Sequence, residues 1–324
     1  MDYLQIQKLS ERVKANVQRV IVGKGEIIDL FMVALIASGH ILLEDVPGMG
    51  KTLLAKTAAR SLDLEFKRIQ FTPDLLPTDI SGLNYFNQKV GEFIFRPGPV
   101  FTNILLADEI NRATPRTQSS LLECMEERQI TIDGETRILE QPFMVIATQN
   151  PVEIQGTFPL PEAQLDRFLL KIKMGYPAAD EGIEVLKRFK SKQPLEEIEQ
   201  VAGKDEIREA QQHYSDVYVS DDLLKYIMDI VEKTRKHPDL ILGVSPRGSQ
   251  AILKCVQVYA ILQGRDYVLP DDVKIMVKPV FSHRIILKNT SRIKENYGEQ
   301  ILDQIIREVP VPTEENLLKK GNEA

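Results

Sequence analysis

The chain has 324 residues, of which 43% are hydrophobic and 27% charged, a composition typical of globular proteins and long enough for two domains. Its formal net charge of −6 at pH 7 argues against a general affinity for nucleic acid or for an anionic membrane. The longest apolar run, residues 30–37, is too short to cross a bilayer and the N-terminus lacks an export signal, so we expect a cytoplasmic protein with no membrane span.

The first predicted elements are two helices followed by a strand and a third helix. Apolar residues at helical spacing indicate helices over residues 3–20 and 26–37, with a break near Gly23. The apolar run from Ile41 to Leu43 then predicts a buried strand, and the Ala- and Leu-rich stretch 53–62 predicts a helix.

A glycine-rich turn joins this strand to this helix. It reads Asp45-Val46-Pro47-Gly48-Met49-Gly50-Lys51-Thr52. Consecutive backbone N–H groups and the N-terminus of a helix attract phosphate in such a turn, while Lys51 reaches the terminal phosphates and the Thr52 hydroxyl ligates Mg²⁺. The usual pattern begins with a glycine where this chain has Asp45, but the residues nearest the phosphates are intact. We therefore predict a nucleoside triphosphate site; the alternative is an ordinary Gly/Pro turn with a surface lysine.

Further apolar segments alternate with helical ones and complete a sheet. The predicted strands are residues 66–71, 104–107, 143–148 and 168–172. Repeated β-α units of this kind predict an α/β fold with a parallel, five-stranded sheet covered by helices on both faces.

Two segments between the predicted strands read as β-hairpin insertions. Residues 83–96 alternate polar and aromatic side chains around Gly91. Residues 129–139 carry Asp133-Gly134 between β-forming residues, which is a strong turn signal.

Strand signals give way to helical ones after residue 176. The predicted helices cover residues 180–190, 205–214, 221–235, 246–263, 270–281 and 299–307. We therefore expect an α/β domain over 1–176, a C-terminal α-helical domain over 177–308 and a mobile tail over 309–324.

Two carboxylates follow the predicted strand 104–107. Asp108 and Glu109 stand at its carboxyl end, the edge at which open parallel sheets bind their ligands. We expect Asp108 to anchor the Mg²⁺ ion through its outer shell, and Glu109 to act as the general base for the water that attacks the γ-phosphate. The alternative is a strand that ends in a polar turn.

Asn150 ends the next predicted strand and is expected to lie beside Glu109, where its amide can orient the attacking water. The alternative is that Asn150 only opens a turn, because Asn before Pro is a common way to begin one.

Two arginines are candidates for contact with the γ-phosphate. Ser245 and Pro246 predict a helix N-terminus, where the cation of Arg247 opposes the helix dipole unless an anion is near. We expect Arg247 to reach that phosphate, with a solvated arginine as the alternative. Arg167 follows Asp166, and from the residues alone it is either an ion-pair partner or an arginine finger for a neighbouring subunit.

Taken together, these motifs resemble the AAA+ ATPases, and specifically the MoxR type. The resemblance covers nearly the whole chain and rests on Ile21 to Gly23, Glu44 to Thr52, Asp108 to Ala113, Ala147 to Pro151, Leu160 to Phe168 and Gly243 to Gly248. Asp45 at the first position of the turn is usual in that family.

The resemblance implies specific roles for the residues of the predicted site. Walker A is implied at Lys51 and Thr52, Walker B at Asp108 and Glu109, and sensor 1 at Asn150. The remaining implied nucleotide-binding positions are the adenine-pocket residues Val22 and Gly23, the turn residues Pro47, Gly48, Met49, Gly50 and Leu53, the arginine finger Arg167 and the sensor 2 residue Arg247. The hairpins at 83–96 and 129–139 resemble the helix-2 insert and the pre-sensor-1 hairpin, and the C-terminal domain resembles the family's lid.

The family also implies what the protein does and with what. Its members form hexameric rings and act as chaperone-like remodellers of protein complexes, often with a partner carrying a von Willebrand factor A domain. The implied cofactors are ATP and Mg²⁺. Three alternatives stay open: a nucleic-acid motor, an ATP-gated binding scaffold without turnover, and a magnesium-chelatase-type subunit.

Overall fold

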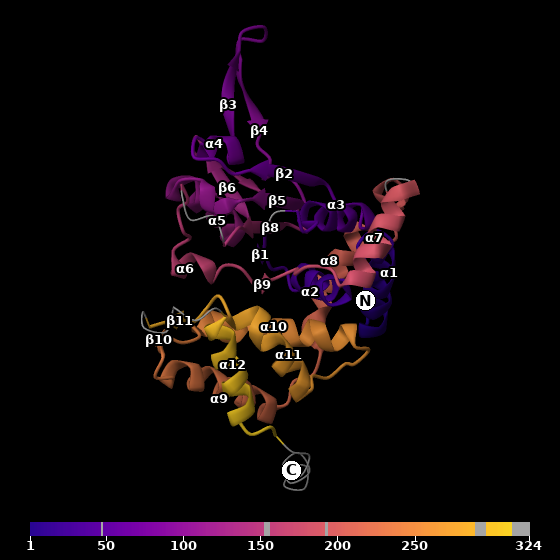
Figure 1. The fold of residues 1–324 in the computed structure, drawn as a ribbon. Helices are drawn as coiled ribbons and strands as arrows, with labels where there is room; N and C mark the ends of the chain where they lie inside the picture. Colours follow the sequence, from indigo (N-terminus) through magenta and orange to yellow (C-terminus); the bar gives the residue numbers. More distant parts are fainter. Residues whose placement is uncertain (47, 152–155, 192–193, 289–295, 313–324) are drawn as a thin grey trace. The chain divides into compact units, whose positions relative to one another are not determined.

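The computed structural model describes residues 1–324 except 47, 152–155, 192–193, 289–295 and 313–324. The chain forms two compact units (Figure 1). Lys8–Gln211 form the α/β unit, and Met1–Gln7 together with the chain from Gln212 form the helical unit. None of the helices within the described ranges is long and apolar enough to cross a membrane.

The α/β unit alternates helices and strands. Its elements are α1 (Tyr3–Gln18, which begins in the other unit), α2 (Gly25–Ile36), β1 (Ile41–Glu44), α3 (Lys51–Ser61), β2 (Phe66–Gln70), α4 (Pro77–Ser81), β3 (Gly82–Asn87), β4 (Glu92–Pro97), β5 (Ile104–Asp108), η1 (Ile110–Arg112), α5 (Pro115–Glu127), β6 (Gln129–Ile132), β7 (Glu135–Ile138), β8 (Met144–Gln149), α6 (Glu162–Leu165), β9 (Leu170–Ile172), α7 (Ala179–Ser191), η2 (Pro194–Glu197) and α8 (Lys204–His213).

The central sheet has five parallel strands in the order β2-β5-β8-β1-β9, which confirms the predicted sheet. Every residue of β5 from Ile104 to Ala107 is fully buried, as expected for a parallel strand covered on both faces. On one face, alternate residues such as Leu105 and Val145 join a core cluster with Leu121 and Leu122 of α5. On the other face α3 packs against β2 and β5. Because the five strands are parallel, their carboxyl ends all lie at one edge of the sheet.

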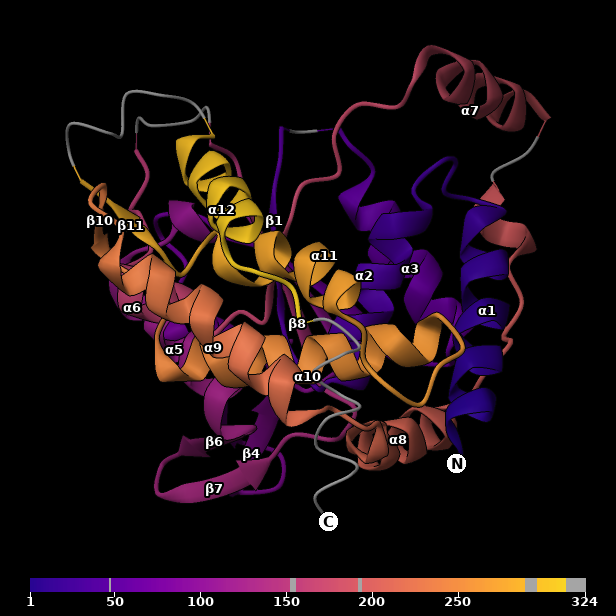
Figure 2. The ribbon, with the colours of Figure 1, turned by 90° about the horizontal axis from the view of Figure 1, so that it is seen from below.

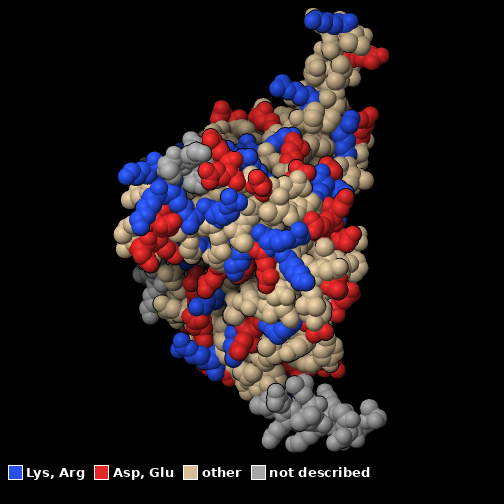
Figure 3. All heavy atoms as spheres, turned by 90° about the vertical axis from the view of Figure 1, so that its right-hand side faces the viewer, with Lys and Arg blue, Asp and Glu red and all other residues tan. Residues whose placement is uncertain are grey.

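Both predicted hairpins are present as two-stranded antiparallel sheets, β3–β4 and β6–β7. The β6–β7 turn uses Asp133 and Gly134 with φ of 51° and 85°, the left-handed pair that the Asp-Gly signal predicts. The β3–β4 hairpin projects from the α/β unit, and its tip carries basic and acidic side chains (Figures 1 and 3). Its ring pair, Phe86 and Phe93, is more than half exposed, at 52% and 74%.

His40, the residue before β1, connects β8 and α5 through the hydrogen bonds of its imidazole ring. Its Nδ1 accepts from the backbone N–H of Val145 at 2.9 Å, and its Nε2 lies 3.0 Å from the carbonyl of Met125 at the end of α5. This pair of bonds requires the neutral imidazole with its proton on Nε2. Burial lowers the pKa of His40 to about 4, which keeps the ring neutral.

The helical unit contains η3 (Tyr214–Asp216), α9 (Asp221–Lys236), β10 (Leu240–Leu242), α10 (Pro246–Leu262), α11 (Pro270–Phe281), β11 (Ile286–Leu287) and α12 (Tyr297–Glu308). Its helices α9 to α12 pack together (Figure 2). Asp272, with 3% of its side chain exposed, receives two hydrogen bonds from Arg265, at 2.6 and 2.8 Å. The β10–β11 pair is too short to leave a strand signal in the sequence.

The compact units divide the chain at Gln211, later than the composition change at residue 176. The reason is that α8 packs on the α/β unit: Gln211 Nε2 donates to the carbonyl of Leu35 at 2.8 Å, and Arg208 Nε donates to that of Gln141 at 2.7 Å. The predicted assignment of residues 177–308 to a separate functional domain stays a prediction. Most of the predicted mobile tail, residues 313–324, lies outside the described residues.

Candidate functional site

The glycine-rich turn at residues 45–52, the predicted phosphate turn, joins β1 to α3 and includes the first residues of α3. Gly48 and Gly50 adopt φ of 83° and 84°, and a Cβ built on either glycine would meet no atom within 4 Å. Glycine is therefore required here by the left-handed backbone rather than by crowding. Gly50 is the N-cap of α3, which begins at Lys51, and Lys51 Nζ donates to the carbonyl of Asp45 at 2.9 Å. The predicted residue Pro47 lies outside the described residues.

Asp108 and Glu109 end β5 as predicted, and Thr148 of the neighbouring strand β8 holds them both. The Thr148 hydroxyl accepts from the backbone N–H of Glu109 at 2.8 Å and donates to Asp108 Oδ1 at 2.6 Å. Glu109 is left-handed, with φ of 56°, which is uncommon for a residue with a Cβ. Thr148 therefore stabilises an uncommon backbone conformation at Glu109.

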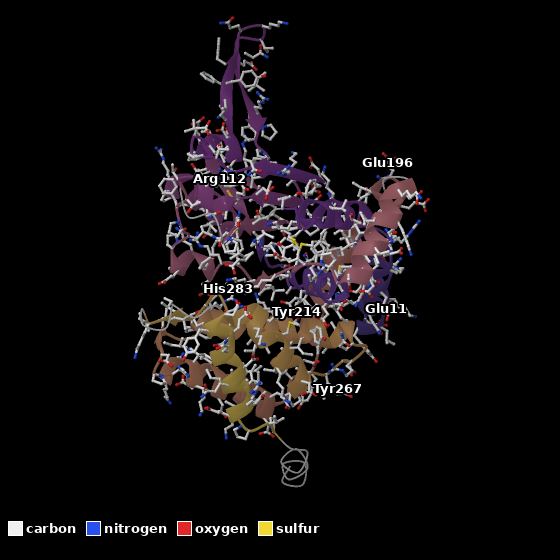
Figure 4. All side chains as sticks on the ribbon, viewed as in Figure 1. Glu11, Arg112, Glu196, Tyr214, Tyr267 and His283 are labelled. Atoms are coloured by element: carbon white, nitrogen blue, oxygen red, sulfur yellow. The ribbon has the colours of Figure 1, made fainter. Side chains whose placement is uncertain are left out.

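Two arginines compensate the charge of this acidic pair, and a glutamine adds a further hydrogen bond. Arg68 of β2 donates to Asp108 Oδ2 from two of its nitrogens, at 2.6 and 3.2 Å. Gln70 Nε2 and Arg112 Nη1 both donate to Glu109 Oε2 at 2.9 Å. Figure 4 labels Arg112 within the α/β unit. With 16% and 22% of their side chains exposed, Asp108 and Glu109 stay accessible to a ligand while their orientation is constrained.

Asn150 follows β8 as Glu109 follows β5. The pairing of Glu44 with Gln149 and of Ala107 with Ala147 brings the ends of β1, β8 and β5 to the same level of the sheet. Asn150 is 6% exposed and lines a cavity of about 420 Å³ with residues that include Asn111 and Gln149. The structure thus gathers the phosphate turn, the acidic pair and Asn150 at one edge of the sheet.

An apolar cavity of about 430 Å³ lies beside the phosphate turn. Its lining comes from three parts of the α/β unit: the segment before α2, the phosphate turn with the start of α3, and the chain from the end of β9 into α7. These residues are Val20, Ile21, Val22, Lys24, Gly48, Met49, Gly50, Leu53, Met174, Gly175, Tyr176, Pro177 and Val185. Gly23, between Val22 and Lys24, has a φ of 69°, a left-handed conformation that favours glycine, and the Glu181 carboxylate of α7 lies beside it.

The two predicted arginines lie in different units. Arg167 precedes β9, and its Nε lies 3.6 Å from Glu126 Oε2 of α5, with 29% of the Arg167 side chain exposed. Arg247 lies in the first turn of α10 in the helical unit and is exposed. The Ser245 hydroxyl caps α10 by accepting from the backbone N–H of Gly248 at 3.1 Å, which confirms the predicted helix start.

The four residues that hold the acidic pair were not predicted as site residues from the sequence: Thr148, Arg68, Gln70 and Arg112. Arg68 and Gln70 stand at alternate positions of β2, so their shared face could have been noticed, but the partner strand was not known. Thr148 carries no signal of its own within an apolar strand. The residues that hold the acidic pair come from 39 to 40 positions away in the chain, except for Arg112.

Comparisons with known proteins agree on one family. A model described as the ATPase family associated with various cellular activities (AAA) matches residues 40–170, and a model for the AAA lid domain matches residues 232–305. Chaperone MoxR1 from Mycobacterium tuberculosis is 40% identical over 96% of this chain and 85% of its own length. Protein MoxR from Paracoccus denitrificans is 32% identical, with 92% and 95% covered.

Two further relatives cover almost the whole chain. The uncharacterized protein YeaC from Bacillus subtilis is 49% identical over 94% of this chain and 95% of its own. The crystal structure of a candidate ATPase from Cytophaga hutchinsonii has a TM-score of 0.90 and 39% identity, covering 96% of this chain and 97% of that one.

Proposed function

Because this chain belongs to the MoxR-type AAA+ ATPases, we propose that it uses Mg²⁺-dependent ATP hydrolysis to remodel or mature protein complexes. That it is an ATP-hydrolysing enzyme with a chaperone-like function follows from the family itself. The observation that carries the proposal is the convergence of the phosphate turn, the acidic pair and Asn150 at adjacent strand ends.

The residues at this edge suit a magnesium ion held together with the triphosphate. The hydroxyl of Thr52 and the carboxylate of Asp108 are hard oxygen ligands, the kind that Mg²⁺ prefers. Among the described residues, no group of three or more His, Cys, Asp or Glu side chains is placed to hold a metal ion without other ligands. We therefore assign Thr52 as a ligand and Asp108 as an outer-shell anchor, with phosphate and water completing the shell. The ion would neutralise charge on the transferring phosphoryl group.

Glu109 is proposed as the general base and Asn150 as the group that orients the attacking water. Gln70 and Arg112 already hold Glu109 Oε2, so the carboxylate is oriented before the nucleotide arrives. Lys51 would leave the carbonyl of Asp45 to bind the terminal phosphates. The apolar cavity lined by Val22, Met49 and Leu53 suits an adenine ring.

Catalysis is proposed to need a second copy of the chain. Arg167 would act as an arginine finger on the neighbouring subunit of a homo-hexameric ring, and its contact with Glu126 would be exchanged for that γ-phosphate. Arg247 would instead contact the γ-phosphate bound by its own chain, so that the helical unit responds to that phosphate. The AAA+ family supports an oligomer; the hexamer, a partner with a von Willebrand factor A domain and a client protein complex are further parts of the proposal.

We propose no nucleic-acid partner. The face in Figure 3 carries acidic and basic side chains intermingled over the α/β unit, and the chain is acidic overall, with a net charge of −6. A salt-sensitive rise in ATP turnover on adding single-stranded DNA would contradict this part. The cytoplasmic location expected from the sequence stays a prediction.

The central test is Glu109→Gln, with Glu196→Gln as a matched control at an exposed position in η2 (Figure 4). We expect Glu109→Gln to bind MgATP normally and to lose at least ~100-fold in turnover, because the amide cannot accept the proton. Glu196→Gln should match the unchanged protein. Near-normal turnover in Glu109→Gln would remove Glu109 from the role, and failure of the unchanged protein to bind MgATP would remove the proposed site.

A further inference from the structure

Asp45 places a carboxylate at the first position of the phosphate turn, where the usual pattern of such turns has a glycine. A negative charge that faced the bound phosphates would oppose their binding. The position of the Asp45 carboxylate therefore decides whether this residue hinders the turn or serves it.

The Asp45 carboxylate turns away from the phosphate side and binds the chain that leaves the sheet after β9. Its Oδ2 accepts from the backbone N–H of Met174 at 2.5 Å and from that of Gly175 at 3.0 Å. The backbone of Asp45 is held as well, since its N–H donates to the carbonyl of Gln149 at 3.2 Å. Asp45 thus links the turn to the ends of two strands.

The segment that Asp45 holds, residues 174–177, forms one wall of the apolar cavity beside the turn. Lys24 holds the same segment as well, since its Nζ donates to the carbonyls of Gly175 and Tyr176, each at 3.1 Å. Its N–H groups are thus bound by a carboxylate and its carbonyls by an ammonium group. Both bonds are charge-assisted, the stronger kind of hydrogen bond.

We propose that Asp45 is a positioning residue that fixes the wall at 174–177 relative to the phosphate turn, so that base and triphosphate bind to one preorganised surface. The inference rests on the proposed function, in which the nucleotide base occupies this cavity. It predicts that a glycine at position 45, although it restores the usual pattern, weakens ATP binding through the base and leaves the phosphate contacts intact.

The test compares two probes, MgATP and magnesium tripolyphosphate, which carries the same phosphate chain without base or sugar. For Asp45→Gly we expect at least about a tenfold loss of ATP affinity, because two hydrogen bonds to a charged group are lost, and a change of less than about twofold for tripolyphosphate. The KM for ATP should rise more than kcat falls. Asp45→Asn should recover most of the affinity, because its amide oxygen can accept the same two N–H groups.

Several results would overturn the inference. One is Asp45→Gly binding ATP as tightly as the unchanged protein; another is an equal loss for both probes, which would mean that Asp45 only shapes the turn. Lys24→Met gives an independent arm if Asp45→Gly does not fold: it should weaken ATP and spare tripolyphosphate, and an unchanged ATP affinity would also reject the inference. Absence of ATP binding in the unchanged protein would instead reject the proposed function.

Discussion

Thr148→Val tests whether a buried hydroxyl organises the acidic pair. Valine keeps the shape of threonine but removes one hydroxyl that accepts from Glu109 N–H at 2.8 Å and donates to Asp108 Oδ1 at 2.6 Å. Thr148 is 1% exposed, so water cannot simply replace the lost group. A neutral hydrogen bond contributes about 0.5–1.5 kcal/mol and one to a charged group about 1.5–3 kcal/mol, so we expect a loss of about 2–4 kcal/mol.

Part of that loss should appear in the site rather than in global stability. Without the hydrogen bond from its N–H to Thr148, the backbone of Glu109 is no longer held in the left-handed conformation. The Glu109 carboxylate can then be displaced, and a displaced carboxylate is a poor general base. We expect kcat to fall by roughly 10- to 100-fold with little change in the KM for ATP.

The assay combines urea unfolding with steady-state ATP turnover. Thr131→Val is the matched control. It makes the same substitution at an exposed position of β6, away from the edge of the sheet that carries the acidic pair. If Thr148→Val showed the unfolding midpoint and the kcat of that control, the assigned role of the hydroxyl would be refuted.

Three further predictions concern other parts of the molecule. Since burial lowers the pKa of His40 from 6.5 to about 4, the stability that the neutral ring contributes is complete above pH 6.5 and is lost as pH falls through 4, by roughly 3 kcal/mol in all; urea unfolding at stepped pH should show that His40→Gln loses this pH dependence, and an unchanged dependence would contradict it. A mixture of Arg167→Ala with Glu109→Gln should hydrolyse more ATP than the sum of the two alone if the arginine acts on a neighbouring subunit, whereas strictly additive rates would argue for action within one chain. Asp272→Asn, which leaves the Arg265 cation without its partner charge, should destabilise the helical unit by about 3 kcal/mol in thermal or urea unfolding, and a loss below about 1 kcal/mol would show that the pair is not important there.

Local patterns identified most of the elements and the glycine-rich turn before α3. The strand, turn and helix around Lys51 are signalled within about twenty residues, because the glycines, the lysine and the apolar runs act on their own neighbourhood. The Asp133-Gly134 turn and the Ser245 cap were predictable for the same reason, since each depends on contacts a few residues away.

Contacts between parallel strands left no such signal. Arg68, Gln70 and Thr148 reach the acidic pair across the sheet from about 40 residues away, and each alone is an ordinary polar residue in a strand. The contacts of α8 with the α/β unit could not be predicted either, because helical periodicity shows that a helix has an apolar face but not what covers it.

The sequence by itself determined which chemical groups the site contains: an anion-binding turn, a lysine, a hydroxyl and two carboxylates, all recognisable from spacing along the chain. Only the tertiary structure decided how they are held. It turned the Asp45 carboxylate toward Met174 and placed Thr148 between Asp108 and Glu109. The physical reason is that a hydrogen bond depends on distance in space, and the strand order β2-β5-β8-β1-β9 makes neighbours of residues that are far apart in the chain.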